Sequence, residues 1–138
     1  MVNKLFISII CFFICSVAYS QAFYKNEIKS KDGIEIKYKI NHTKMFDKNS
    51  PVKLSLKLKN TNNYDVNLGF EIEYSTGFTT RYKSGNVDIC IPGRMTRKGK
   101  ANGLAFELNT NDKDIFSSDD TEWEFTKFDI KQTEKCDR

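Results

Sequence analysis

The sequence predicts an all-β protein that folds as a single antiparallel β-sandwich of about seven to nine short strands. Three observations predict this class: apolar residues alternate with polar ones, turn residues recur between the alternating runs, and no long helical pattern is present. The clearest alternation lies between Pro51 and Tyr74, in two runs separated by an Asn-rich break. Successive side chains of a strand point to opposite faces, so each run predicts a strand with one apolar face. The apolar positions are Val52, Leu54, Leu56 and Leu58 in the first run, and Val66, Leu68, Phe70, Ile72 and Tyr74 in the second.

The chain before this stretch predicts a β-hairpin. A short strand over residues 27–30 is followed by a turn at Asp32-Gly33, and both of these residue types tolerate positive φ. The second strand, over residues 34–41, has alternating apolar side chains at Ile34, Ile36, Tyr38 and Ile40. Residues 44–50 then form a polar connection. Pro51 closes it, because proline has no N–H to donate and therefore suits the start of a strand.

The second half of the chain continues the same pattern. Strands are predicted over residues 78–83 and 87–91, and the turn dipeptide Pro92-Gly93 follows the second of them. A basic, glycine-spaced run from Arg94 to Gly103 leads into another strand. The apolar positions of that strand are Leu104, Phe106 and Leu108.

Two further features precede the end of the chain. Residues 109–120 predict a helical turn, capped by Asn109 or Thr110, with aspartates in its first turn. In the last strand, two pairs of apolar residues are out of phase: Trp123 and Phe125 against Phe128 and Ile130. A β-bulge near Thr126-Lys127 would return both pairs to one face, because an extra residue inverts the alternation.

The N-terminus, residues 1–20, predicts a cleaved secretion signal peptide. An apolar run over residues 5–18 follows a positive start, and small residues precede a cut before Gln21, with a cut after Ala22 as the alternative. The apolar run is shorter than the roughly 20 residues of a spanning helix. We therefore expect residues 21–138 to form one β-sandwich domain that is secreted or periplasmic and has no transmembrane segment.

Two cysteines remain after such a cut, Cys90 and Cys136. An even count in an exported chain predicts a disulfide, because the compartment is oxidising. A bond between the two cysteines would close a loop of 46 residues in the unfolded chain. For such a loop the chain-entropy relation gives about 4 kcal/mol of stabilisation. Two free thiols, or pairing of Cys136 with another chain, are the alternatives.

The composition argues against several classes of function. The net charge of +4 is small, and the basic and acidic residues are interspersed along the chain. We therefore expect no nucleic-acid partner. His42 is the single histidine, and the two cysteines look structural, so we predict no catalytic residue, cofactor or metal ligand. An acidic run could hold calcium but lacks the spacing of an EF-hand, so a capped turn with exposed carboxylates is preferred. The run comprises Asn111, Asp112, Asp114, Asp119, Asp120 and Glu122.

The basic run from Gly93 to Gly103 is a candidate contact for an anionic partner. Its cations are Arg94, Arg97, Lys98 and Lys100. The run does not match a phosphate-binding loop, because Ala101 follows the lysine where serine or threonine is required. A strand edge kept soluble by charge is the preferred interpretation.

The turn motifs of this region resemble those of a known family. One strand ends in Lys-Asn-Thr-Asn (residues 59–62), a second ends in Tyr-Ser-Thr-Gly (residues 74–77), and Ile91-Pro92-Gly93 precedes a third. The pattern looks like the small immunoglobulin-like modules found in exported bacterial proteins. It departs from antibody domains in having no tryptophan on the third strand and no Tyr-x-Cys motif, since Asp88 precedes Ile89-Cys90.

The resemblance implies how the two central strands are joined. In a hairpin they would pair, and Lys53 would lie opposite Glu71. In an immunoglobulin-like sandwich the Asn-rich segment arches between sheets, and the apolar faces meet across the core. We expect the arch, with Lys53, Lys57 and Lys59 on one outer surface. Glu71 and Glu73 would then lie on the other.

The resemblance also implies a function, because such modules mostly bind proteins or form parts of envelope assemblies. We therefore expect a non-catalytic module that binds another protein, of an inhibitor, immunity or adhesion type. Its edge strands would offer a contact through added β-pairing. The alternatives are a structural component of a cell-envelope or surface assembly, and a hydrolase with an unrecognised site.

Overall fold

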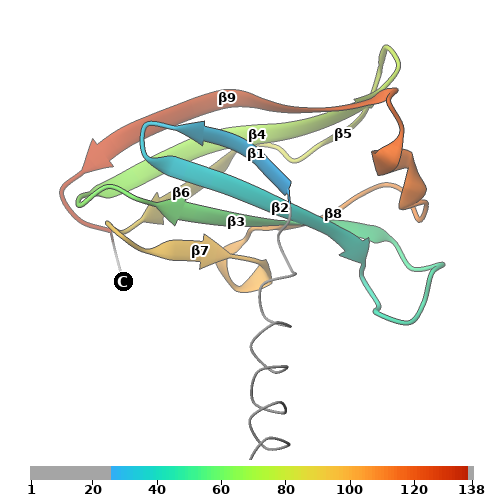
Figure 1. Cartoon of the computed structure of the whole chain (residues 1–138), viewed down its shortest axis with the longest axis horizontal. Helices are drawn as coiled ribbons and strands as arrows, with labels where there is room; N and C mark the ends of the chain where they lie inside the picture. The colour runs from blue at the N-terminus through green and yellow to red at the C-terminus, as the bar shows by residue number, and fades with distance from the viewer. Residues whose placement is uncertain (1–25, 137–138) are drawn as a thin grey trace, which may run out of the picture.

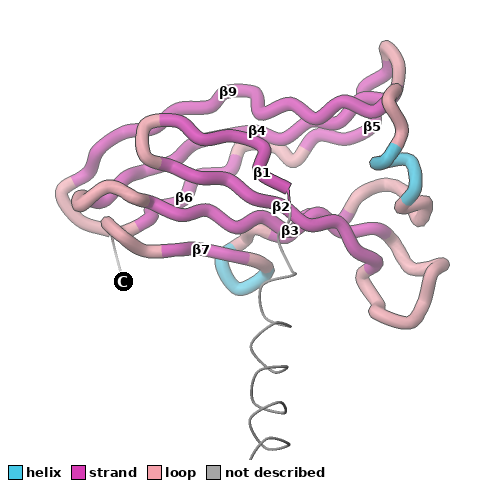
Figure 2. The backbone as a smooth tube through the Cα atoms, in the orientation of Figure 1, coloured by secondary structure: helices cyan, strands magenta, loops and turns pink. Residues whose placement is uncertain are grey.

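The computed structural model describes residues 26–136, and the predicted signal peptide lies outside the described residues. Two antiparallel β-sheets pack face to face (Figures 1 and 2), which confirms the predicted all-β sandwich. The strands are β1 (Asn26–Lys31), β2 (Ile34–His42), β3 (Val52–Asn60), β4 (Asp65–Thr76), β5 (Thr79–Lys83), β6 (Val87–Ile91), β7 (Thr96–Lys98), β8 (Ala105–Glu107) and β9 (Thr121–Thr133). Two short 3-10 helices, η1 (Lys100–Asn102) and η2 (Asp114–Ser117), lie in the connections.

Each sheet is built around one long central strand. In the first sheet, one edge of β3 pairs with β2, and β2 pairs in turn with β1. The other edge of β3 pairs with the short strands β7 and β8. In the second sheet β9 pairs with β4 along its whole length, and the other side of β4 pairs with β5 and β6. The central strands carry most of the core because they are covered on both edges and on one face.

Strands β3 and β4 belong to different sheets, so the segment between them is the predicted arch and not a hairpin. Their apolar faces meet in the core, where the alternating leucines of β3 are fully buried. On the outer face of the first sheet, Lys59 of β3 pairs with Glu35 of β2. On the outer face of the second sheet, Glu71 of β4 pairs with Lys127 of β9. The lysines of β3 and the glutamates of β4 therefore lie on opposite surfaces, as the arch requires.

Asn60 holds the arch together from inside the sandwich. Its side chain is 0% exposed, and its amide donates to the carbonyls of Tyr64 (2.8 Å) and Ile91 (3.0 Å). Its Oδ1 accepts a hydrogen bond from the Asn62 N–H at 2.9 Å. One side chain therefore fixes both limbs of the arch and ties them to the end of β6.

Neighbouring turns close this end of the sandwich over the arch. Thr61 donates to the Gly33 carbonyl from both its N–H and its hydroxyl, each at 2.8 Å, so the Asp32-Gly33 hairpin docks on the arch. The turn after β6 docks on the arch from its other side. A Cβ at Gly93 would lie 2.8 Å from the Asn63 carbonyl carbon, so this close approach requires glycine.

The predicted bulge in β9 is present. Gly69 pairs with Asp129, but Glu71, two residues further along β4, pairs with Thr126, so β9 carries one extra residue between these points. Lys127 adopts φ of +51° there. As a result the aromatic and apolar side chains on both sides of the bulge pack against the core: Trp123, Phe125, Phe128 and Ile130.

Two local expectations are wrong, and one strand is additional to those expected. Phe78 lies in the two-residue turn before β5 and not in the strand, because Gly77 takes the positive φ that the turn needs. The helical turn is η2, which begins after Lys113 without a side-chain cap, whereas the Thr110 hydroxyl accepts from the Asp112 N–H in an earlier turn. Part of the basic run forms strand β7, which was not predicted as a separate strand.

Candidate binding surfaces

The disulfide between Cys90 and Cys136 is formed, with the Cα atoms 5.5 Å apart. It joins β6 to the segment that follows β9. The Asp65 carboxylate supports the same junction, because Oδ2 accepts from the Cys136 N–H at 2.8 Å and Oδ1 from the Gly93 N–H at 2.9 Å. The end of the sandwich that holds the arch is therefore closed by covalent and hydrogen bonds.

The four basic residues of the predicted anionic contact follow one edge of the first sheet and do not form a single cluster. Arg94 lies in the turn before β7, and Lys100 lies in η1 after it. On β7, Arg97 is opposite the buried Leu58, while Lys98 is opposite Lys57, so these neighbours point to different faces. Contact of this run with an anionic partner stays a prediction.

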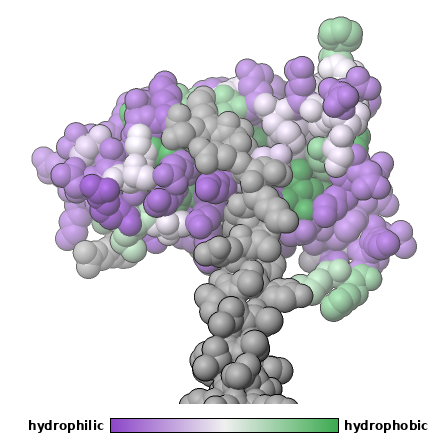
Figure 3. Space-filling model, viewed as in Figure 1, coloured by the Kyte–Doolittle hydropathy of each residue, from purple (hydrophilic) through white to green (hydrophobic). Residues whose placement is uncertain are grey.

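The opposite end of the sandwich exposes large apolar side chains. In the β2–β3 loop Met45 is 87% exposed and Phe46 is 96% exposed, and Phe78 in the β4–β5 turn is fully exposed. Both segments lie at the end away from the arch (Figure 1), and Figure 3 shows two apolar protrusions there. Helix η2 lies between them.

The β2–β3 loop holds its apolar residues in a defined conformation. The Ser50 hydroxyl donates to the Asp47 carbonyl (2.7 Å) and accepts from the Lys44 N–H (3.1 Å). At the base of the loop the Thr43 N–H donates to the Pro51 carbonyl at 2.8 Å. The side chains of Met45 and Phe46 are therefore presented outward by a loop that is hydrogen-bonded internally.

Sequence reasoning missed these three apolar residues. The sequence predicts a polar connection over residues 44–50, although Met45 and Phe46 lie within it. A pair of apolar residues inside a polar loop was the available signal, because packing of the two strands does not require them. Phe78, next to a turn glycine, gave a similar signal.

The outer edge of β9 is a second candidate surface. Within residues 26–136, β9 pairs with β4 on one side, and no strand pairs with its other side. This edge is 13 residues long and is interrupted by the bulge at Lys127. Bulges discourage edge-to-edge pairing. Binding of a partner strand to an edge strand of this sandwich stays a prediction.

The catalytic and metal candidates have structural surroundings. His42 ends β2, and its Nδ1–H donates to the Ser50 carbonyl at 2.9 Å, so this ring nitrogen helps close the loop. In the described part of the chain no group of three histidine, cysteine or acidic side chains is placed to hold a metal ion. At the open end of the core, burial raises the pKa of the hydroxyl groups of Tyr74 and Tyr82.

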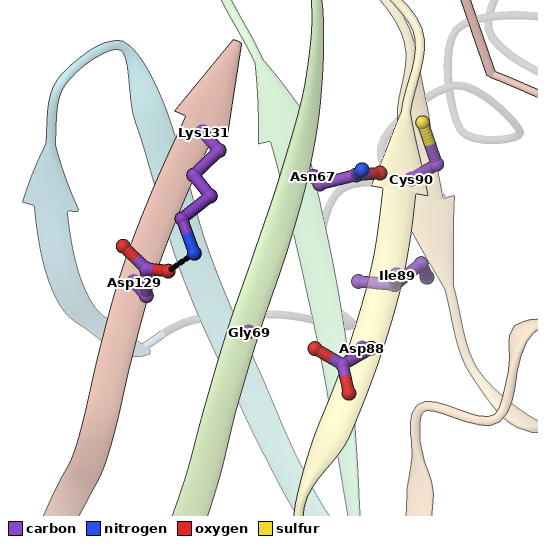
Figure 4. Close-up of a pocket in the computed structure, with 7 residues that line it drawn as sticks. All are labelled: Asn67, Gly69, Asp88, Ile89, Cys90, Asp129 and Lys131. Carbon is purple, nitrogen blue, oxygen red and sulfur yellow. Dashed lines mark ion pairs between the residues drawn. The ribbon is translucent and has the colours of Figure 1, made fainter. Parts of the chain in front are cut away.

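The outer face of the second sheet carries a shallow hollow of about 400 Å³ above Gly69 (Figure 4). Asp88 on β6 and Asp129 on β9 are both directly opposite this glycine, one on each side. Lys131 bonds to Asp129 at 2.7 Å, and this hydrogen bond raises the pKa of the Lys131 ammonium. The Cys90 end of the disulfide borders the hollow.

No protein family, curated protein or solved structure matches this chain. No helix within residues 26–136 has the length and apolar character needed to cross a membrane.

Proposed function

We propose that this chain is an exported, non-catalytic module of the immunoglobulin-like type that binds another protein through the end of the sandwich bearing Met45, Phe46 and Phe78. The outward display of these three side chains from two loops at one end is the observation that carries the proposal. We call these three residues the apolar tips.

The fold itself does not need apolar residues at these positions. The β4–β5 turn requires Gly77, whose φ is +57°, but a polar residue would serve as well as Phe78. Burial of a phenylalanine or methionine side chain contributes about 1.5–3 kcal/mol. A protein partner that covers the apolar tips would gain this free energy, and a few such anchors carry most of the affinity in protein interfaces.

The construction of the molecule suits a binding module. The hydrogen-bonded β2–β3 loop presents its tips without a large ordering cost on binding. The β4–β5 turn is tied to the segment before β9, because the Gly77 N–H donates to the Asp120 carbonyl at 2.8 Å. The signal pattern in residues 1–20 supports the proposed export. A non-catalytic role agrees with the structural use of His42.

The test is a quantitative capture of proteins from the secreted and cell-envelope fractions of the source organism. The disulfide-intact protein is compared with Phe46→Ser/Phe78→Ser and with a control, Met95→Ser. Met95 is 50% exposed and follows Arg94 in the turn between β6 and β7, near the arch. We expect one partner to bind the wild type and the control equally, and the tip variant at least about tenfold more weakly.

Two results would overturn the proposal. One is a partner that binds the tip variant as tightly as the wild type. The other is the absence of any protein that distinguishes the wild type from the tip variant. Circular dichroism and melting curves of each variant verify that the substitutions leave the fold intact.

A further inference from the structure

We propose that copies of this chain associate head to tail, with the outer face of the β3 sheet in one copy docked on the outer face of the β4 sheet in the next. The two sheets place opposite charges on opposite surfaces of the sandwich. These faces are separate from the apolar tips at the end of the molecule.

The outer face of the first sheet is basic. Lysines recur at the outward positions of β2, β3 and β7, and few acidic residues lie among them. The described charged side chains on this basic face are Lys37, Lys39, Lys53, Lys57, Lys59 and Lys98, with Glu35 and Glu107. One row across β2, β3 and β7 consists of Lys37, Lys57 and Lys98 directly opposite one another, and the register continues it to Glu27 on the edge strand β1.

The outer face of the second sheet is acidic. Its outward positions on β4, β5, β6 and β9 carry twice as many carboxylates as lysines. The acidic face comprises Glu71, Glu73, Asp88, Glu122, Glu124 and Asp129, with Lys83, Lys127 and Lys131. Each of these three lysines is already paired within the face, to Glu73, Glu71 and Asp129 respectively.

Each face therefore carries charges that form no ion pair within the described part of the chain. Lys57 and Lys98 are directly opposite each other, so two positive charges face one another across the strands. Neither forms an ion pair with a described acidic residue. On the acidic face Glu124 is likewise opposite Glu73, and neither Glu124 nor Asp88 forms an ion pair there. Like charges directly opposite destabilise a sheet. A second copy supplies the opposite sign to both faces at once.

The hollow above Gly69 gives this contact a defined centre. With no side chain on Gly69, the flat face is recessed between Asp88 and Asp129, and Figure 4 shows the two carboxylates on either side of it. Lys131 forms its ion pair with Asp129, whereas Asp88 acts on Lys131 only through its charge and forms no ion pair among the described residues. A lysine from the basic row of the next copy can enter here and pair with Asp88.

This arrangement uses two different surfaces of the same chain, so it is heterologous and generates an open row of copies unless the rotation closes a ring. Each exposed ion pair contributes only about 0.2–1 kcal/mol, so several must form together. Association should be weak and should disappear at about 0.5 M salt, where charges are screened within a few ångströms.

Sedimentation equilibrium of the disulfide-intact protein tests the proposal. In about 20 mM salt we expect the weight-average mass to rise with concentration up to about 1 mM, and in about 0.5 M salt to fall to that of the monomer. The basic-face variant is Lys57→Glu/Lys98→Glu and the acidic-face variant is Asp88→Lys/Glu124→Lys. Each should associate at least about tenfold more weakly than the wild type.

Mixing the two variants gives the decisive result. The reversed face of one complements the reversed face of the other, and their native faces also match, so the mixture should regain the association that each variant lacks alone. Lys48→Glu/Lys135→Glu changes the net charge equally, but Lys48 lies in the β2–β3 loop and Lys135 after β9. This control should associate like the wild type.

Three outcomes would overturn the proposal. The first is a wild type that stays monomeric at low salt throughout the concentration range. The second is a mixture that stays monomeric although the wild type associates. The third is a control as defective as the basic-face variant, which would assign the effect to net charge and not to the faces.

Discussion

The substitution Asn60→Ala tests how the arch between the sheets is held. The Asn60 side chain is 0% exposed and makes three hydrogen bonds, two to carbonyls of Tyr64 and Ile91 and one from the Asn62 N–H. Alanine leaves all three backbone groups without this partner. At about 1–1.5 kcal/mol for each of the three bonds, the loss in the free energy of unfolding is about 3–4.5 kcal/mol. Small domains have only about 5–15 kcal/mol in total.

Urea denaturation followed by circular dichroism measures this loss. The matched control is Asn63→Ala, since Asn63 is an exposed residue of the same arch. We expect the control to stay within about 0.5 kcal/mol of the wild type. If Asn60→Ala costs less than about 1 kcal/mol, the hydrogen bonds of this side chain do not hold the arch, and the reasoning fails.

Asn60→Asp separates hydrogen bonding from shape. Aspartate has the same size, but a carboxylate oxygen would face the two carbonyls that the amide now serves. Burial and these carbonyls should raise the folded-state pKa of the new carboxyl. The contribution of this carboxyl to the free energy of unfolding is then fully present below its unfolded-state pKa of about 3.9. That contribution is lost as the pH rises through the raised folded-state pKa. The difference from the wild type should therefore shrink as the pH falls from 7 towards about 4, and a constant difference would contradict this account.

Two further predictions concern the disulfide and the half-buried Tyr82. Replacing Cys90 and Cys136 by alanine should lower the free energy of unfolding by up to about 4 kcal/mol, because the bond closes a loop of 46 residues in the unfolded chain; unchanged urea midpoints would refute this. Burial raises the pKa of Tyr82 from its ordinary value of 10.0, so stability present at neutral pH is lost as the pH rises through the folded-state pKa. Tyr82→Phe should therefore flatten the decline in melting temperature between about pH 9 and about pH 11, and a decline as steep as that of the wild type would count against it.

Local patterns predicted much of this fold. The period of two identified the buried faces of β3 and β4, and the Asp32-Gly33 dipeptide identified the first hairpin. The change of phase in β9 revealed a bulge that the register confirms. These features are encoded locally, because alternation and positive φ depend on a residue and its near neighbours.

The disulfide was also predictable, for a different reason. Once residues 1–20 are set aside as a signal, only Cys90 and Cys136 remain, so an intramolecular bond has a single possible pairing. The candidate surfaces were less predictable. Exposure of Met45 and Phe78 depends on which loops the sandwich leaves uncovered, and no short pattern states this.

By itself, the sequence determined most of the strands, which of their faces are apolar, most of the turns and the first hairpin. It did not determine how the two central strands are joined, because alternation in β3 and β4 is equally compatible with a hairpin and with an arch. Only the tertiary structure decided this, through Asn60 and the docking of distant turns on the arch. That decision separated the lysines of β3 from the glutamates of β4 and gave the two faces opposite charge. Pairing between strands is set by non-local packing and hydrogen bonding, which a local period cannot encode.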